Sequence, residues 1–334
     1  MQKKLQSQQL IVITGAAGFI GSCLVKHLNN LGYYNLVLVD DIGTSDKWKN
    51  LLGKRFKCLL SIDKLFEWLQ GKEKEVAAFI HLGACSDTLE NRVDYLLDNN
   101  TRFTIRLAEY ALQHGQRFIY ASSAATYGDG SQGFSDDHNR LHELKPLNPY
   151  GYSKHLFDLW ALEQGVIDRL VGLKYFNVYG PNEQHKGRMA SMVCKMVPQI
   201  EKEGVIRLYK STEPERFSDG GQCRDFIYVK DVVAMTCSFL DNLHGGIYNI
   251  GAGEPATWNQ LATALFKAMD YPVNIEYIDM PADLAKQYQN YTCADMEKFN
   301  KITGHAQKGA PLQFSLEDAV RDYVQGYLMK GTTW

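Results

Sequence analysis

The sequence lacks the features that mark several large classes of protein. The apolar run at residues 10–13 is far too short to span a membrane. The 36 basic and 38 acidic residues nearly cancel to a net charge of −2, which gives no reason to expect a nucleic-acid or membrane partner. Residues 1–9 contain two lysines, but no apolar run of the length found in a signal peptide follows them, so no signal peptide is expected.

Regularly spaced cysteines are also missing. The seven cysteines are scattered, odd in number and never arranged as Cys-x-x-Cys, which favours free thiols in a reducing cytoplasm. His81 and Cys85 come nearest to a metal-ligand pair, but a histidine at a strand end and a small buried thiol explain them better. We therefore expect no metal site.

What is present is an alternation of short apolar runs with longer amphipathic stretches. In the first half we expect strands at residues 10–13, 36–39, 77–81, 118–121 and 171–175, and helices at 19–31, 93–114 and 150–164. Strands that alternate with helices predict crossover connections and a parallel sheet. The expected fold class is α/β, with a Rossmann-type doubly wound sheet and a smaller α/β lobe.

After about residue 176 the pattern changes, because glycines, prolines and charges interrupt it. Strands are expected at 225–229 and 274–278, and helices at 231–242, 256–269 and 315–330. A chain of 334 residues is long enough for two lobes. We assign residues 1–175 plus about 222–250 to a dinucleotide-binding domain, and about 176–221 plus 251–334 to a substrate-binding domain.

Three glycines come directly after the first strand and open the first helix. Gly15 permits a tight turn, Gly18 lets the backbone approach a pyrophosphate, and Gly21 lets helix and strand pack closely. Free N–H groups at the helix start can then hold the diphosphate. Asp40 stands 19 residues beyond Gly21, at the end of the second strand, where an acidic residue meets the adenosine ribose. Together these residues predict a nucleotide site.

The sequence leaves NADP and NAD open as the cofactor. Asp40 alone favours a free 2′-hydroxyl, as in NAD. Lys47, seven residues on, could instead neutralise the 2′-phosphate of NADP. A solvated loop lysine explains Lys47 equally well.

A serine, a tyrosine and a lysine follow in an order that suits redox chemistry on a sugar. Tyr150 and Lys154 are four residues apart, so one helix face carries both. An ammonium beside a phenol stabilises the phenolate, so we expect Lys154 to lower the pKa of Tyr150 toward neutrality. Such a phenol can remove a hydroxyl proton while a cofactor takes the hydride, and Ser123 can hydrogen-bond the reacting oxygen.

The glycine turn, Ser123 and Tyr-x-x-x-Lys, in that order, resemble the extended short-chain dehydrogenase/reductase family. Residues 98–100 (Asp-Asn-Asn) and 224–232 (Arg-Asp-Phe-Ile-Tyr-Val-Lys-Asp-Val) look like those of the nucleotide-sugar epimerases and dehydratases. Within that family the chain is most similar to the group that inverts C6 of an ADP-linked heptose. The runs that carry this are 83–86, 120–128, 150–154 and 174–181, with His-Lys-Gly at 185–187 and Met-Ala-Ser at 189–191.

This resemblance implies an isomerase that converts ADP-D-glycero-D-manno-heptose to its L-glycero isomer, by removing and returning a hydride through tightly held NADP. It also implies a cytoplasmic homo-oligomer, a pentamer, that serves the lipopolysaccharide inner core. The implied cofactor contacts are Phe19, Ile20, Asp40, Asp41, Lys47, Lys64, Leu82, Gly83, Ala84, Cys85, Ser86, Asn99, Lys154, Val178 and Lys186. The implied substrate contacts are Ser123, Asn177, Tyr209, Arg224 and Tyr288, with Arg188 and Lys195 as further positive groups for a diphosphate.

Inversion needs a second proton carrier, and Lys186 is the candidate. Either Tyr150 or Lys186 takes the C6 hydroxyl proton, and the other returns one to the opposite face. A phosphate-binding or solvated loop lysine is the alternative for Lys186. The residues Asp41, Leu82, Arg188 and Lys195 depart from those usual in the family.

Three other functions compete with this interpretation. Another epimerase, such as a UDP-hexose 4-epimerase, would share the tyrosine, lysine and serine. A 4,6-dehydratase would need an acidic pair where Ala124 and Ala125 stand. A non-catalytic NADP-binding regulator would have no need to keep Ser123, Tyr150 and Lys154 together.

Overall fold

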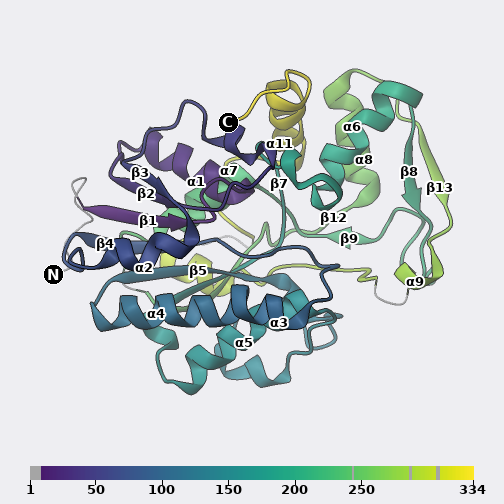
Figure 1. The fold of residues 1–334 in the computed structure, drawn as a ribbon. Helices are drawn as coiled ribbons and strands as arrows, with labels where there is room; N and C mark the ends of the chain where they lie inside the picture. The colour runs from purple at the N-terminus through teal and green to yellow at the C-terminus, as the bar shows by residue number, and fades with distance from the viewer. Residues whose placement is uncertain (1–8, 243, 286–287, 306–308) are drawn as a thin grey trace.

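The computed structural model describes residues 9–242, 244–285, 288–305 and 309–334. The expectation that residues 1–9 hold no signal peptide therefore falls almost wholly outside the described residues. Within the described part, a large parallel sheet has helices on both faces, and a smaller group of helices and strands lies at one end of it (Figure 1).

Every strand pair in the seven-stranded main sheet is parallel. Its spatial order is β11 (Gly246–Ile250), β6 (Val171–Tyr175), β5 (Arg117–Ser123), β4 (Val76–His81), β1 (Leu10–Thr14), β2 (Leu36–Val39) and β3 (Cys58–Leu60). The smaller pairs are β7 (Asn177–Tyr179) with β10 (Phe226–Tyr228), β8 (Ile206–Tyr209) with β13 (Ile275–Ile278), and β9 (Cys223–Arg224) with β12 (Ala256–Thr257). The predicted doubly wound α/β fold is confirmed.

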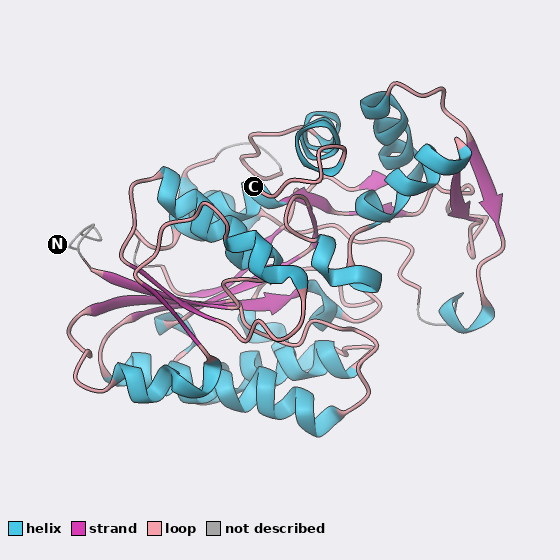
Figure 2. Ribbon diagram, turned by 45° about the horizontal axis from the view of Figure 1, so that its top comes forward, coloured by secondary structure: helices cyan, strands magenta, loops and turns pink. Residues whose placement is uncertain are grey.

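The helices either lie on the two faces of the main sheet, which Figure 2 shows between them, or belong to the smaller group at its end. They are α1 (Phe19–Asn30), α2 (Leu65–Leu69), α3 (Val93–Leu96), α4 (Phe103–Gln113), α5 (Pro149–Glu163), α6 (Met192–Glu203), α7 (Val229–Ser238), α8 (Trp258–Met269), α9 (Ala282–Ala285), α10 (Glu297–Thr303) and α11 (Leu316–Tyr323). In Figure 1, α3, α4 and α5 lie below the sheet, and α6 and α8 lie beside β8 and β13 at the far end.

The pleat of β1 explains why both faces of the sheet are covered. Successive side chains of a strand point to opposite faces. Ile11 and Ile13 belong to the core cluster that includes α1 and α7, whereas Leu10 and Val12 belong to the cluster that includes α4 and α5. All four are buried, as expected of a parallel strand between two helical layers.

The expected helix over 93–114 is present but is not regular. A π-helical segment at Leu97–Arg102 separates α3 from α4. Such segments widen the turn and are frequent at functional sites. This one contains Asn99 and Asn100, which matter for the site below. Strands β3 and β11 and helix α6, which contains Pro198, were not expected from the sequence.

None of the described helices combines the length and the hydrophobicity that crossing a membrane would require.

Candidate functional site

A cavity of about 950 Å³ opens at the carboxyl ends of the central strands. Thr14, His81 and Ser123 end β1, β4 and β5, and all three line it. Residues from the glycine turn, α5 and the segment 175–193 complete its wall. Parallel α/β sheets bind ligands at this edge, because the loops that follow the strands converge there.

The glycine turn forms one end of the cavity and leaves no space for side chains. A Cβ on Gly21 would lie 2.1 Å from the carbonyl oxygen of Gly15, and a Cβ on Gly15 would lie 2.6 Å from the amide nitrogen of Gly83. Gly15 also has φ +66°, a left-handed conformation that favours glycine. The backbone of the glycine turn is therefore in direct contact with the start of α1 and with the loop that contains Gly83.

The start of α1 suits an anion. No side chain caps its first turn, so free N–H groups remain next to the cavity, where Gly18, Phe19 and Ile20 line the wall. These groups and the helix dipole attract a phosphate. The residues present therefore fit the diphosphate of a dinucleotide cofactor.

The part of the cavity wall next to the glycine turn carries an acidic residue and a basic one. Asp40 accepts a hydrogen bond from the Ala17 amide at 2.8 Å, and the Lys47 ammonium lies 2.6 Å from its other carboxylate oxygen. Asp41 also lines the cavity and accepts from the Ile62 amide at 3.0 Å. The structure therefore brings Asp40, Asp41 and Lys47 together, as the sequence led us to expect.

Lys64 is the member of the expected cofactor set that lies away from the cavity wall. Its ammonium is exposed and pairs with Glu67 at 3.2 Å, on the short helix that follows. Nothing in its surroundings directs it toward Asp40.

The loop after β4 forms the middle of the wall. Residues 82–86 all line the cavity. Asn100 fixes this loop, because its amide accepts from the Cys85 N–H at 2.9 Å and donates to the Cys85 carbonyl at 3.0 Å. It also donates to Ser153 Oγ on α5, while the neighbouring Asn99 lines the cavity. The π-helical segment thus joins the loop after β4 to the helix that bears Tyr150.

Ser123, Tyr150 and Lys154 all line the cavity. Ser123 ends β5, and its hydroxyl is close enough to the Tyr150 phenol to lower the pKa of that phenol. Asn148 caps α5 by accepting from the Gly151 amide at 2.8 Å, which places Tyr150 and Lys154 on the first turns of the helix. The predicted constellation therefore assembles on elements distant in sequence.

The protonation of this group differs from the sequence expectation. Burial raises the pKa of Tyr150, and the hydrogen bond from Ser123 opposes that rise. Lys154 is buried too, and burial lowers its pKa to about 8, with Asp158 and Cys85 acting in the opposite direction. The expected lowering of the Tyr150 pKa by Lys154 is thus wrong for this structure, because desolvation of the phenol dominates.

Lys186 lies in the segment Gln184–Met189 and also lines the cavity. Its ammonium stacks over the Phe19 ring, 5.6 Å from the centroid. Burial lowers the pKa of Lys186, and the carboxylate of Glu183 opposes this. The structure therefore places a partly buried lysine in the cavity that also contains Tyr150.

The residues expected to hold the substrate divide into two groups. Asn177 lines the cavity. Arg224 is only 7% exposed and lies against the ring of Tyr288, with 4.8 Å between the guanidinium carbon and the centroid. Burial raises the pKa of Tyr288, the Arg224 charge opposes this, and Tyr209 adds to the rise. Tyr209, Arg224 and Tyr288 thus form one cluster just beyond the cavity.

Two residues that the sequence analysis overlooked connect this cluster to the cavity. Trp258 donates from its indole nitrogen to the Tyr288 hydroxyl at 2.9 Å, and its ring packs edge-on against Phe226. Both aromatic residues line the cavity. Trp258 begins α8 after the Thr257 cap, and this helix start was the one local signal that could have drawn attention to it.

Arg188 and Lys195 are not among the residues of the cavity wall. The Arg188 guanidinium lies 2.5 Å from the Asp87 carboxylate, which joins the segment 184–189 to the loop after β4. Lys195 lies on α6 and is close enough to Lys186 to lower its pKa. The structure gives Arg188 a partner in the protein and leaves its expected role toward a substrate untested.

Comparison with known proteins assigns the chain. Residues 11–251 match the NAD dependent epimerase/dehydratase family. A protein from Nitratidesulfovibrio vulgaris named ADP-L-glycero-D-manno-heptose-6-epimerase is 49% identical over 96% of this chain and 98% of its own length. The chain belongs to the NAD dependent epimerase/dehydratase family.

Two further proteins that are similar to the chain carry the same name as the Nitratidesulfovibrio vulgaris relative. One, from Fusobacterium nucleatum, is 43% identical over 96% of this chain and 98% of its own length. The other is a crystal structure from Helicobacter pylori, with a TM-score of 0.77, 28% identity and 96% of each chain covered. The sequence resemblance to nucleotide-sugar epimerases is therefore confirmed.

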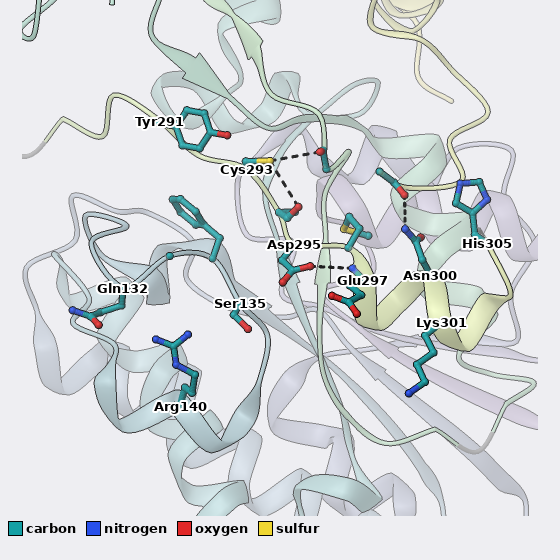
Figure 3. Close-up of a pocket in the computed structure, with 16 residues that line it drawn as sticks. Gln132, Ser135, Arg140, Tyr291, Cys293, Asp295, Glu297, Asn300, Lys301 and His305 are labelled. Atoms are coloured by element: carbon teal, nitrogen blue, oxygen red, sulfur yellow. Dashed lines mark hydrogen bonds between the residues drawn. The ribbon is translucent and has the colours of Figure 1, made fainter. Parts of the chain in front are cut away.

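This family member also has a second hollow, of about 810 Å³, which Figure 3 shows. It lies between the loop 132–135 and residues of the segment 291–305, with Gly309 beside them, and none of the expected site residues lines it. Several of its polar side chains bind other groups of the protein, since Arg140 pairs with Glu143 and Asn300 donates to the Gly309 carbonyl. Among the described residues, no cluster of three or more His, Cys, Asp or Glu side chains could hold a metal ion.

Proposed function

We propose that the protein inverts C6 of ADP-D-glycero-D-manno-heptose to give ADP-L-glycero-D-manno-heptose. The observation that carries this is the presence of Ser123, Tyr150, Lys154 and Lys186 around one cavity, beside a glycine turn that fits a dinucleotide. Relatives that are 43–49% identical to the chain, and are matched over nearly their whole length, are named as that epimerase. The protein is accordingly an isomerase.

The residues support a mechanism with two proton carriers. When bound, a nicotinamide cofactor would take the C6 hydride and later return it to the other face. Burial raises the pKa of the Tyr150 phenol, which favours its protonated form. Burial lowers the pKa of the Lys186 ammonium, which favours its deprotonated form. Such a pair suits removal of a proton by one group and its return by the other.

Ser123 and Lys154 would orient these steps. The Ser123 hydroxyl is close enough to Tyr150 to lower the pKa of its phenol, and it would bond the reacting sugar oxygen next to it. Lys154, with its pKa at about 8, keeps its proton at neutral pH and supplies a positive charge beside the phenol. Arg224, Tyr288 and Trp258 would hold the far end of the substrate, where a guanidinium suits the diphosphate and the rings suit the base.

We propose NADP as the cofactor within this NAD dependent family. Asp40 alone would repel a 2′-phosphate, but Lys47 lies 2.6 Å from it and can neutralise that charge. The similarity to heptose epimerases also supports a cytoplasmic homopentamer that acts on lipopolysaccharide inner-core precursors. The same similarity supports the assignment of about residues 176–221 plus 251–334 to a substrate-binding domain. Light scattering of the purified protein tests whether it is a pentamer.

The direct test of the function uses the purified protein, its own bound cofactor and ADP-D-glycero-D-manno-heptose. We expect NMR to show conversion of the C6 configuration to the L-glycero isomer. UDP-glucose serves as the second substrate, because a UDP-hexose 4-epimerase would convert it to UDP-galactose. Absence of conversion of the heptose by folded, cofactor-loaded protein would overturn the proposal.

A further inference from the structure

Asp158 and Lys174 form an ion pair inside the protein that the mechanism above does not use. Both side chains are fully buried, and the Lys174 ammonium lies 3.1 Å from Asp158 Oδ2. Removing two charges from water is unfavourable, so a buried ion pair is weak evidence for a contribution to stability alone. Its connections to neighbouring groups therefore indicate its role.

On the Asp158 side, the carboxylate is held by the strand that carries Ser123. Asp158 Oδ1 accepts from the Tyr120 hydroxyl at 2.9 Å, and Oδ2 accepts from Ser122 Oγ at 2.7 Å. Gly172 on the neighbouring strand makes space for this arrangement, since a Cβ there would lie 2.4 Å from the Tyr120 hydroxyl oxygen. Helix α5 is thus tied to the end of β5.

On the Lys174 side, the ammonium reaches the turn that follows Ser123. It donates to Thr126 Oγ1 at 2.5 Å, and Thr126 Oγ1 donates in turn to the Ser123 carbonyl at 2.8 Å. It also lies over the Tyr127 ring, 4.8 Å from the centroid. Every polar atom of the pair has a partner, so the network can have one well-defined geometry.

Asp158 also lies one helical turn beyond Lys154, so it faces the same side of α5. The other titratable groups around Lys154 are Tyr150 on its own helix, Cys85 on the loop after β4 and His81 at the end of β4. Burial lowers the pKa of Lys154, and the Asp158 charge is the largest influence in the opposite direction.

We propose that Asp158 and Lys174 are a positioning pair, which holds Ser123 at a fixed place relative to Tyr150 and keeps a carboxylate beside Lys154 inside the protein. Lys174 performs two tasks in this arrangement. It pairs with the buried Asp158 carboxylate, and through Thr126 it fixes the backbone of Ser123. The catalytic part of this inference rests on the proposed epimerase function.

The electrostatic part is tested without turnover. The pKa of Lys154 is measured by NMR in protein labelled with ¹³C at lysine Cε, with the resonance assigned by its loss in Lys154→Met. In the double variant Asp158→Asn with Lys174→Met, which leaves no unpaired buried charge, the pKa of Lys154 is expected to fall by about one unit. An unchanged pKa overturns this part, whatever reaction the protein catalyses.

The positioning part is tested by Thr126→Val, which removes the link to Ser123 and keeps both charges. We expect kcat to fall at least about fivefold, with KM within about twofold and the pKa of Lys154 unchanged. Lys174→Arg, which retains charge and donors, is expected to keep more activity than the double variant. Wild-type kcat in a folded Thr126→Val protein overturns this part.

An exposed ion pair of similar composition provides the control. Arg207 and Glu203 are 2.7 Å apart on the surface at the end of α6. Glu203→Gln with Arg207→Met is expected to leave the pKa of Lys154, kcat and the pH profile as in the wild type. If the wild type itself fails to epimerise the heptose, the proposed function fails, while the NMR titration still decides whether Asp158 acts on Lys154.

Discussion

Lys47 and Asp40 form an ion pair of 2.6 Å at the cavity wall, and the same carboxylate accepts a hydrogen bond from the Ala17 amide. Asp40 is therefore held against the glycine turn, while Lys47 remains partly exposed at the cavity wall. An anion arriving beside Asp40 would meet the ammonium first. This arrangement bears directly on the choice between NADP and NAD.

We expect Lys47→Met to weaken NADP binding by roughly 10- to 100-fold, because it removes a charge-assisted contact to the 2′-phosphate. NAD binding should change by less than about threefold, since NAD has no group for that charge. Titration of cofactor-free protein with each dinucleotide measures both constants. Lys64→Met is the control, because Lys64 lies outside the cavity wall and pairs with Glu67. Equal losses for the two cofactors would contradict a role for Lys47 in selection.

Gly21 should not tolerate even a methyl group. Gly21→Ala would put a Cβ 2.1 Å from the Gly15 carbonyl, so α1 must move away from β1. We expect unfolding free energy to fall by about 1–3 kcal/mol and bound cofactor to be lost. Thermal unfolding and the absorbance of the purified protein measure the two effects. Gly326→Ala is the matched control, because its Cβ would meet nothing nearer than 3.8 Å. Equal behaviour of the two variants would argue against close packing at the turn.

Local pattern in the sequence was enough to predict that the glycine turn and Asp40 lie together at one cavity. Gly15, Gly18 and Gly21 act within one strand–helix turn, and Asp40 ends the adjacent strand, so spacing alone indicates their geometry. Tyr150 and Lys154 share a helix, so their proximity also follows from spacing. The alternation of strands and helices predicted the fold class for the same reason.

Properties that depend on tertiary packing could not be predicted in this way. Arg188 pairs with Asp87, 101 residues away, and no local signal marks that contact. The pKa of Tyr150 depends on how deeply the folded chain buries it, and burial reverses the shift expected from Lys154. The partners of Asp158 come from β5 and β6, which the helix pattern around Lys154 does not reveal.

Tyr150 and Lys186 should both be needed for turnover. Tyr150→Phe and Lys186→Met are each expected to lower kcat by roughly 10²- to 10⁴-fold, because each removes a proton carrier on one face of the sugar. Rates of C6 inversion at saturating substrate, with cofactor content checked for each variant, provide the measurement. Lys202→Met, at an exposed position on α6, is the control. Full activity in Lys186→Met would leave inversion to Tyr150 alone.

The two arginines expected to contact the substrate should differ in effect. Arg224 is buried against Tyr288 and Trp258, so Arg224→Ala should raise KM by about tenfold or more and change kcat by less than about threefold. Arg188 is exposed and paired with Asp87, so Arg188→Ser should change either constant by less than about threefold. Steady-state kinetics of both variants decide between them. A drop in kcat with unchanged KM for Arg224→Ala would contradict a binding role.

His81 is held as a neutral imidazole under the cavity. Thr104 Oγ1 donates its proton to the Asn100 carbonyl at 2.6 Å, so His81 Nε2 must donate to Thr104 at 2.8 Å. His81 Nδ1 then accepts from the Thr14 hydroxyl at 2.6 Å, and Thr14 Oγ1 remains free to accept the Gly83 amide at 3.1 Å. Protonation of Nδ1 would break this chain of hydrogen bonds.

Acid should therefore destabilise the protein through His81. Burial, assisted by the charge of Lys154, lowers the pKa of His81 from 6.5 to about 3. The unfolded chain binds this proton below about pH 6.5 and the folded chain does not, so the stabilisation is complete above pH 6.5 and is lost as the pH falls toward 3.

At pH 5 the loss of unfolding free energy should be roughly 2 kcal/mol. Denaturant unfolding at pH 7.5 and pH 5 measures it, and His81→Gln should reduce the difference between the two pH values by about that amount. An equal pH dependence in wild type and His81→Gln would show that the imidazole beneath the cavity does not couple folding to pH.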